Sequence, residues 1–264
     1  MSEFSQKIQK NRMESECMNE CINASLYWDK FSFKDFRTRL LKKDTHDLAF
    51  EICVKLNEIL SKSSQIIDHL KEQRDRLIKK FVEDNNVVFD DKLAVKGKLL
   101  VGSGLPSILE VGMNLSRNYG LPVIPGTALK GCFSHYCKEK KILNQDDFKV
   151  VFGEDTSPQM ENIRGGIIFL DAFPVERVEF GLDVVNNHFS RYYINGEIPN
   201  DWYNPIPVTY VVVAKGVFRF TLLAITDLRQ DLKEKLKNAF REMLRDYGVG
   251  AKTNYSYGRF TDKA

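Results

Sequence analysis

The chain has 264 residues, 43% of them hydrophobic and 28% charged, and its formal net charge is +3. This length and apolar content suffice for one large domain or two small ones with a buried core, so we expect a soluble globular protein. The near balance of charges excludes recognition of nucleic acid or membranes through overall charge, and any basic site must therefore be local.

The first twenty residues are too polar for the apolar core of a signal peptide, and no apolar run approaches the ~20 residues of a membrane helix. We therefore expect a cytoplasmic location and no membrane partner. The five cysteines contain no C-x-x-C pair, which suits a reducing compartment; they are Cys17, Cys21, Cys53, Cys132 and Cys137. Cys132, His135 and Cys137 on one short helix would give poor tetrahedral geometry, so we predict no metal and no cofactor.

The N-terminal part of the chain is predicted to be mainly helical. The first 45 residues are polar with short aromatic stretches. They could form either short helices or a docking arm. From Asp47 to about Glu83, apolar residues recur near helical spacing with a break at "SKSS", which predicts two helices. The β-branched residues of "NNVVF" and "LAVKGKLLVG" then indicate the start of a sheet. We expect a helical region over residues 1–85, packed on a core over residues 86–264.

The core is predicted to contain strands separated by long loops rich in Gly, Pro and Asn. "GGIIFLDAF" is typical of a strand, and "VTYVVVA" and "GVFRFTLLAIT" predict a hairpin with a tight turn at Lys215 and Gly216. A helix follows, with Asp227 as its cap, Gln230 completing a capping box and Gly248 as its left-handed stop. A final strand near residue 260 closes the chain.

This order of elements defines the expected fold. Strand, helix, strand, then hairpin, helix, strand is the order of a ferredoxin-like (RRM-like) α+β sheet. The long loops would be insertions in that fold.

The stretch "LPVIPGTALKGCFSHYCKEK", residues 121–140, joins a short apolar strand to the start of a helix. Thr127 can cap this helix, and Lys130 and Gly131 fall in its first turn, where free N–H groups and the helix dipole favour an anion. The lysine adds a mobile charge for a phosphate. A capped helix with an incidental lysine is the alternative interpretation.

The stretch "DYGVGAKTNYSYGRF", residues 246–260, predicts a supple and basic loop. Its "GVGAKT" is close to the end of a P-loop, but Ala251 and Asp246 stand where that motif needs glycines, and the loop follows a helix. A P-loop NTPase is therefore excluded. The glycines are expected where backbone approaches another group closely, whereas Tyr255 and Tyr257 fit either stacking or the core.

The stretch "NNHFSRYYINGE", residues 186–197, places His188 and Arg191 beside two tyrosines in a predicted loop. Such residues suit binding of single-stranded nucleic acid. They suit equally well the packing of a long loop onto the protein. No Ser or Cys nucleophile motif accompanies His188, and the paired carboxylates are typical of solvated turns. We therefore predict no catalytic residue.

Taken together, six stretches in order between residues 100 and 260 resemble the RAMP superfamily of CRISPR proteins, within it the subunits of type III-B (Cmr) effector complexes. The stretches are "GSGLPSILEVG", "YGLPVIPGTALKG", "FGED" with "IIFLDAFP", "VVNNHFSRYY", "DWYNPIPVTY" and "YGVGAKTNYSYGRF".

The resemblance implies a RAMP fold and a non-catalytic subunit that binds guide RNA (crRNA) toward its 3′ end and caps the filament of backbone subunits. Its partners would be the crRNA, other Cmr subunits, especially backbone and end-capping RAMP subunits, and, as a further candidate, target RNA. Such a subunit must contact sugar and phosphate, because guide sequences vary. The RNA-binding residues implied on this chain are Gly126, Thr127, Lys130, Gly131, His188, Arg191, Gly248, Gly250, Lys252, Thr253 and Arg259.

Two other functions stay open. A metal-independent RAMP endoribonuclease would use His188 as its acid/base and Lys252 to stabilise the developing phosphate charge. A protein-only scaffold would use the glycine-rich loop to dock a partner subunit. In related backbone subunits RNA cleavage relies on an aspartate in a flexible loop, and Asp91, Asp155 and Asp183 match no such motif.

Overall fold

The computed structural model describes residues 21–32, 45–154 and 163–262. The chain forms two compact units that alternate along the sequence: unit 1 has residues 1–62, 103–121 and 180–212, and unit 2 has residues 63–102, 122–179 and 213–264. The division expected near residue 85 stays a prediction. Most of the polar N-terminal segment and Asp155 lie outside the described residues.

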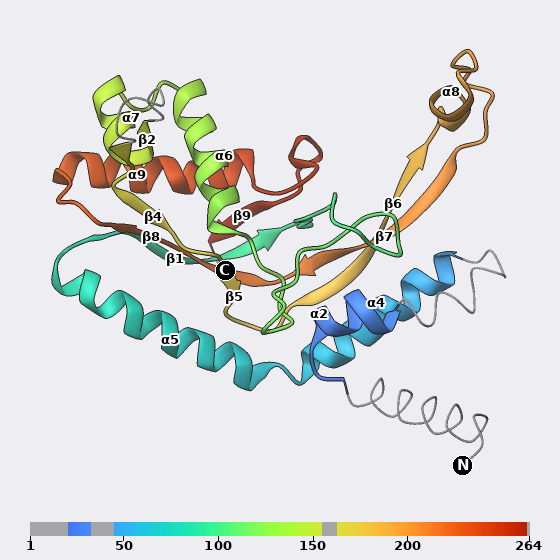
Figure 1. Ribbon diagram of the computed structural model, residues 1–264, viewed down its shortest axis with the longest axis horizontal. Coiled ribbons are helices and arrows are strands. Elements are labelled where there is room, and N and C mark those ends of the chain that lie inside the picture. The colour runs from blue at the N-terminus through green and yellow to red at the C-terminus, as the bar shows by residue number, and fades with distance from the viewer. Residues whose placement is uncertain (1–20, 33–44, 155–162, 263–264) are drawn as a thin grey trace. The chain divides into compact units, whose positions relative to one another are not determined.

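Unit 1 contains helices and a two-stranded ribbon. Its elements are α2 (Ala24–Leu26), the π-helix η1 (Tyr27–Phe31), α4 (Thr45–Ser61), β6 (Glu179–Asn187), α8 (Ser190–Asn195) and β7 (Ile206–Lys215), the last of which continues into unit 2. α4 buries Leu48, Ile52 and Leu56 at four-residue steps, as an amphipathic helix should. β6 pairs with β7, and α8 lies at the end of this ribbon (Figure 1).

Unit 2 contains the main sheet. Its elements are α5 (Ser64–Glu83), β1 (Val87–Lys96), α6 (Gly126–Glu139), α7 (Gln145–Phe152), β2 (Gly153–Glu154), β3 (Ile163–Arg164), β4 (Ile167–Phe169), β5 (Phe173–Pro174), β8 (Val217–Ala224), α9 (Gln230–Glu242), the π-helix η3 (Met243–Tyr247), the 3₁₀-helix η4 (Thr253–Tyr255) and β9 (Arg259–Asp262). The antiparallel order is β4-β8-β1-β9, with β5 also pairing with β8. The chain order β1, α6, β4, β8, α9, β9 confirms the predicted ferredoxin-like α+β fold.

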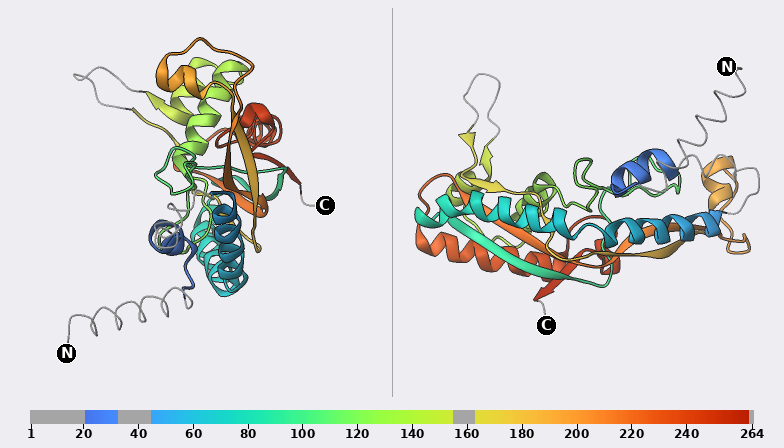
Figure 2. Two further views of the ribbon diagram at one scale, coloured as in Figure 1. Left: turned by 90° about the vertical axis from the view of Figure 1, so that its right-hand side faces the viewer. Right: turned by 90° about the horizontal axis from the view of Figure 1, so that it is seen from below.

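Helices cover both faces of this sheet. α6 and α9 lie on one face and α5 on the other (Figures 1 and 2). On the first face the ring of Phe240 lies 5.1 Å from those of Phe89 and Phe133, edge to face. On the second face Arg74 of α5 donates to Thr221 Oγ1 at 3.0 Å. Aromatic packing therefore holds α6 and α9, whereas α5 adds polar contacts to the sheet.

The two helices predicted between residues 47 and 83 are confirmed as α4 and α5. The predicted hairpin at Lys215 and Gly216 is wrong, because β7 pairs with β6 whereas β8 pairs with β1, β4 and β5. The chain passes at this point from the ribbon into the main sheet, and the Gly216 carbonyl accepts the N–H of Val95 at 2.9 Å. Alternating residues identify strands but not their partners, which explains the error.

The predicted cap of the last long helix is also wrong. α9 begins at Gln230, directly after Arg229, and none of the described side chains caps it. Asp227 instead lies 4.0 Å from Lys233 Nζ. The predicted position of the stop is confirmed, since Gly248 follows η3 with φ +80°, but its ψ of 172° is extended and not the predicted left-handed helical conformation. An N-cap depends on where the incoming loop lets the helix begin, which spacing alone does not reveal.

Candidate nucleic-acid interface

The start of α6 already binds a carboxylate of the protein itself, that of Asp171. Pro125 precedes the helix and Thr127 lies exposed inside its first turn, so the prediction that Thr127 caps this helix is wrong. The Gly126 N–H donates to Asp171 Oδ1 at 2.7 Å. A Cβ on Gly126 would lie 2.0 Å from the carbonyl oxygen of Phe169, so close packing requires glycine there. The carboxylate satisfies one of the unpaired N–H groups of the helix end.

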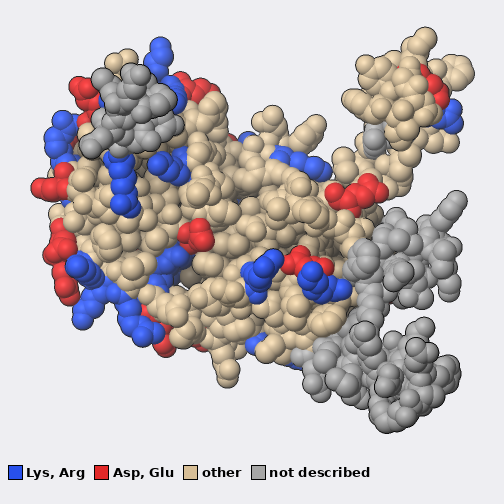
Figure 3. All heavy atoms as spheres, in the orientation of Figure 1, with Lys and Arg blue, Asp and Glu red and all other residues tan. Residues whose placement is uncertain are grey.

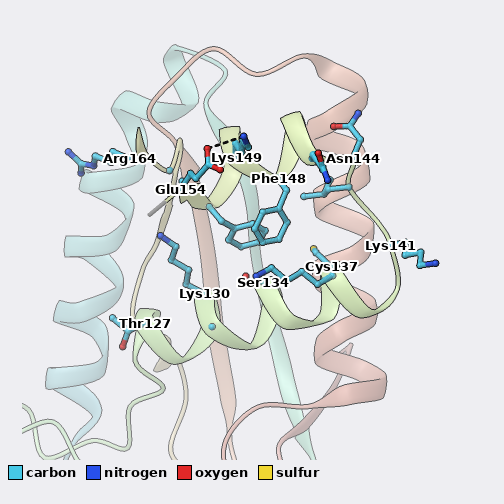
Figure 4. A pocket seen from close by; sticks show the side chains of 17 residues that line it. Thr127, Lys130, Ser134, Cys137, Lys141, Asn144, Phe148, Lys149, Glu154 and Arg164 are labelled. Atoms are coloured by element: carbon cyan, nitrogen blue, oxygen red, sulfur yellow. Dashed lines mark ion pairs between the residues drawn. The ribbon is translucent and has the colours of Figure 1, made fainter. Parts of the chain in front are cut away.

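A groove runs along one side of α6. Its volume is about 1110 Å³, and α6, α7 and the short strands β2 and β3 contribute its lining. Three predicted RNA-binding residues, Thr127, Lys130 and Gly131, line it. Lys130 extends from α6 into this space, with Ser134 one turn further along the helix (Figure 4). We call this feature the α6–α7 groove.

The α6–α7 groove is basic. Its charged lining residues are Lys130, Lys138, Lys141, Lys149, Glu154 and Arg164. Glu154 pairs with Lys149 at 3.0 Å, and it is the only carboxylate among the described residues that line the groove. Figure 3 shows Lys and Arg side chains over the α6–α7 region of this face. The groove therefore has a local positive charge that the net charge of the chain does not reveal.

The floor of the groove is aromatic. The rings of Phe148 and Phe152 lie 4.7 Å apart, and Lys138 Nζ lies 4.9 Å from the centre of the Phe148 ring. Phe152 is buried and Phe148 is half-buried. The groove thus combines mobile cations with an apolar surface, a combination suited to phosphates and the bases attached to them.

The glycine-rich loop folds against its own chain. Its residues with positive φ are Gly248, Gly250, Lys252, Ser256 and Gly258. The Ala251 N–H donates to the Leu100 carbonyl at 2.7 Å, and the Gly258 N–H donates to the Lys98 carbonyl at 2.7 Å. A Cβ on Gly250 would lie 2.4 Å from Leu100 O, and one on Gly258 would lie 1.8 Å from Val249 O. The close approach expected at these glycines is made to the backbone of the protein itself.

Cationic side chains gather around this loop. Lys98 Nζ and Lys252 Nζ lie 5.9 and 6.0 Å from the centre of the Tyr257 ring. Arg259 lies opposite Lys96 in the pairing of β9 with β1. We call the surface formed by Lys96, Lys98, Lys252, Tyr257 and Arg259 the glycine-loop patch.

The charge of the glycine-loop patch acts on Asp246. A hydrogen bond from Arg245 is the main cause that lowers the pKa of this carboxyl, and the positive charges of Arg259 and Lys96 lower it further. Arg259 Nε is buried and has no hydrogen-bond partner among the described residues. Thr253 begins η4 on the same loop.

The two tyrosines of the loop differ in exposure. Tyr255 is 80% exposed, whereas Tyr257 is half-buried beside Lys98 and Lys252. Tyr255 is therefore outside the core and available for stacking.

The α6–α7 groove and the start of the glycine-rich loop lie on different sides of α6. Lys130 and Ser134, four residues apart, face the groove. Cys132 Sγ instead donates to the Gly248 carbonyl at 3.4 Å, and the Tyr136 ring lies edge to face with Tyr247 at 5.1 Å. Residues four apart share a helix side and residues two apart do not. The structure therefore brings the predicted residues of unit 2 together as two groups, one at the groove and one at the glycine-rich loop.

His188 and Arg191 belong to unit 1, at the end of the β6–β7 ribbon. His188 is exposed, with its ring 6.5 Å from that of Phe189. The Arg191 guanidinium lies 5.0 Å from the centre of the Tyr203 ring, in reach of cation–π attraction. The remaining predicted residues belong to unit 2.

Sequence reasoning missed Lys138, Lys141, Lys149 and Arg164. A signal for the first two was present, because "KEKK" at residues 138–141 continues the basic side of α6 begun by Lys130. No local pattern links Arg164 to them, because β3 reaches the groove only through the tertiary fold.

Within the described ranges, no group of three or more His, Cys, Asp or Glu residues is placed to hold a metal ion. Burial raises the pKa of the Cys132 thiol and raises that of Cys137 to about 12. Asp91 pairs with Arg241. Asp183 lies on β6, so neither aspartate occupies a flexible loop.

The fold and these basic surfaces define a class of protein. The model of the RAMP superfamily matches residues 92–261, and the chain belongs to that superfamily. A more particular relationship is to Cmr6 of Pyrococcus furiosus, named as a subunit of its CRISPR Cmr system: the two chains are 31% identical over 274 aligned residues, covering 79% of this chain and 80% of Cmr6. The resemblance to RAMP proteins is thus confirmed.

Two further relatives agree with this assignment. Cmr6 of Saccharolobus solfataricus is 24% identical, covering 75% of this chain and 64% of that protein. A chain in the structure of the type III-B Cmr-beta complex bound to cognate target RNA has the same fold, with a TM-score of 0.58 and 21% identity over 84% of this chain and 76% of that one. Among the described helices, none is long and apolar enough to cross a bilayer.

Proposed function

We propose that this chain is a non-catalytic crRNA-binding subunit of a type III-B CRISPR ribonucleoprotein, which binds toward the crRNA 3′ end and caps the backbone filament. The observation that carries the proposal is the 31% identity to Cmr6 across most of both chains. The proposed partners are the crRNA, backbone and end-capping RAMP subunits, and target RNA, which is present in the related complex. A cytoplasmic location belongs to the same proposal.

Phosphate recognition by mobile cations supports this role. Lys252 and Arg259 of the glycine-loop patch, with Thr253 beside them, are proposed to contact one stretch of crRNA backbone, and Lys130 a phosphate near the start of α6. Contacts of this kind do not depend on base identity, so they suit a guide of varying sequence. The glycines Gly126, Gly248 and Gly250 would act indirectly, because their contacts shape the loops that present these cations.

His188 and Arg191 are proposed as additional contacts from unit 1. The exposed His188 ring offers a stacking face, and Arg191 offers a phosphate donor already oriented against Tyr203. Their substitution should weaken crRNA binding less than substitution of the lysines.

Co-purification tests the proposal. A tagged chain should recover crRNA and other Cmr subunits from native cells, and Lys130→Ala with Lys252→Ala should reduce the recovered crRNA. Lys79→Ala with Lys80→Ala, on the exposed side of α5, is the matched control with the same loss of charge. Recovery of Cmr subunits with unchanged crRNA in the Lys130/Lys252 variant would favour a protein-only scaffold.

Incubation with crRNA precursor separates the proposal from the endoribonuclease alternative. Purified full-length chain without added metal should leave the precursor intact. Specific cleavage that Lys79→Ala retains and His188→Ala abolishes would establish an acid/base role for His188 and overturn the non-catalytic assignment.

The net charge of +3 also predicts weak binding by the chain alone. Tight binding should require the assembled complex, in which neighbouring subunits complete the path of the RNA. Binding of crRNA by the isolated chain as tightly as by the complex, at the same salt concentration, would contradict this expectation.

A further inference from the structure

The α6–α7 groove has features that the glycine-loop patch does not explain. Tyr247 of η3 and Gly248, where the glycine-rich loop begins, lie against the side of α6 that carries Cys132 and Tyr136. The groove faces the other side, toward α7, β2 and β3. An RNA strand bound only at the glycine-loop patch would therefore not contact the residues of the groove.

The cations of the groove have few internal partners. Among the described residues, Lys130 and Lys138 form no ion pair, although Lys138 rests over the Phe148 ring. Lys149 is the exception, since Glu154 neutralises it. Cations that pair with no carboxylate add repulsion to the folded protein, and an anionic ligand would relieve that repulsion.

The spacing of these cations suits a chain of phosphates. Lys130 and Lys138 are eight residues apart on α6, which corresponds to about 12 Å along the helix axis. Lys141 and Arg164 lie at two ends of the groove in Figure 4. One phosphate group cannot contact all of these cations together, whereas successive phosphates of a nucleic-acid strand can. The half-buried Phe148 gives an apolar surface for the attached bases.

We propose that the α6–α7 groove binds a second stretch of single-stranded RNA through its phosphates, separate from the stretch at the glycine-loop patch. The inference rests on the proposed function, because it takes the chain to be an RNA-bound subunit. Lys130 and Lys138 contact successive phosphates along α6, and Arg164 contacts the strand where it leaves the groove.

The test compares three pairs of substitutions in the full-length chain. The groove pair is Lys130→Ala with Lys138→Ala, the patch pair is Lys98→Ala with Lys252→Ala, and the control pair is Lys79→Ala with Lys80→Ala. Fluorescence anisotropy measures binding of a labelled oligouridylate across a range of salt concentrations. Loss of two phosphate contacts should reduce the slope of log K against log salt by about 1.4, which is 0.7 for each contact.

Cross-linking adds a readout of position. An oligouridylate containing 4-thiouridine should cross-link to peptides from residues 127–149 in the wild-type chain and the control pair. The groove pair should lose these cross-links and keep those near Tyr255 and Tyr257. Cross-links confined to the glycine-rich loop in every variant would overturn the inference.

The outcomes separate the two proposals. If the groove pair matches the control pair while the patch pair has a smaller slope, the groove inference and the proposed Lys130 contact are wrong, and the crRNA-binding role of the chain stands on the patch. If both pairs match the control pair, neither surface binds RNA in the isolated chain, and the groove inference and the proposed contacts at the glycine-loop patch are both wrong. If the groove pair retains the RNA slope but loses a Cmr subunit from the reconstituted complex, an acidic protein surface occupies the groove and the RNA inference is overturned.

Discussion

The two sides of α6 differ in what their residues contact. On the side of the glycine-rich loop, Cys132 and Tyr136 pack on residues 247–248, and Gly258 packs on Val249. On the groove side, Lys130 and Lys138 form no ion pair with any described residue. Residues that resembled a ligand-binding loop therefore hold the protein together, whereas lysines that could have been incidental have no comparable internal role.

The comparison separates stability from binding. Glycine has the conformational freedom that close approach of two backbones requires, so a glycine-rich loop is as consistent with internal packing as with a ligand. A basic groove has no such internal explanation, because burying or crowding like charges costs free energy. Substitutions of the loop glycines should reduce stability, whereas substitutions of the groove lysines should reduce RNA binding.

The largest expected effect is at Gly258. Gly258→Ala places a methyl group where 1.8 Å separates it from Val249 O, in a residue with φ +64°. The left-handed conformation alone costs an L-residue about 1–2 kcal/mol, and the displaced backbone adds to this, so we expect a loss of about 3 kcal/mol or more in unfolding free energy. Urea denaturation measures the change.

Gly131→Ala is the matched control on α6, because among the described residues outside its own helix turn no atom lies within 4 Å of the point that a Cβ on Gly131 would occupy. Alanine should stabilise the helix there by about 0.5–1 kcal/mol. If Gly258→Ala and Gly131→Ala had equal unfolding free energies, the proposed difference between the two sides of α6 would be wrong.

A smaller effect is expected from Tyr136 at alkaline pH. Burial is the main cause that raises the pKa of Tyr136 from 10.0 to about 12, and the nearby Glu242 carboxylate adds to it. A raised folded-state pKa contributes stability that is present below pH 10 and is lost as the pH rises toward 12. The loss should be on the order of 1 kcal/mol by about pH 11.

Unfolding of the wild type and Tyr136→Phe at several alkaline pH values isolates this contribution from those of other tyrosines. The stability of the variant should fall less steeply with pH. Parallel curves would show that Tyr136 ionises as easily in the folded chain as in the unfolded one.

The smallest effect is expected at Asp171, whose carboxylate holds the Gly126 N–H. Asp171→Ala removes a single capping contact from the start of α6, for a loss of about 0.5 kcal/mol. It also removes a negative charge from the start of α6, so oligouridylate should bind more tightly at low salt.

Asp171→Asn retains an acceptor oxygen and removes the charge. It should keep most of the stability and show the same gain in RNA affinity as Asp171→Ala. Unchanged affinity in both variants would place the bound RNA away from the start of α6.

Much of the fold could be predicted because its signals are local. Leu232, Leu236 and Phe240 recur at four-residue steps and are buried on α9, as that spacing indicates. The break between α4 and α5 and the positive φ at Gly248 were predictable for the same reason. The partners of β7 and β8 were not, since pairing depends on residues far away in the chain.

The sites divide in the same way. The sequence by itself determined the strand and helix order, the supple loop at residues 248–258 and the lysine at the start of α6, because each depends on neighbouring residues. Only the tertiary structure decided that Gly250 packs on Leu100, that Asp171 holds the α6 start, and that α7 and β3 complete a basic groove. These contacts join segments that sequence order keeps apart, so no local propensity encodes them.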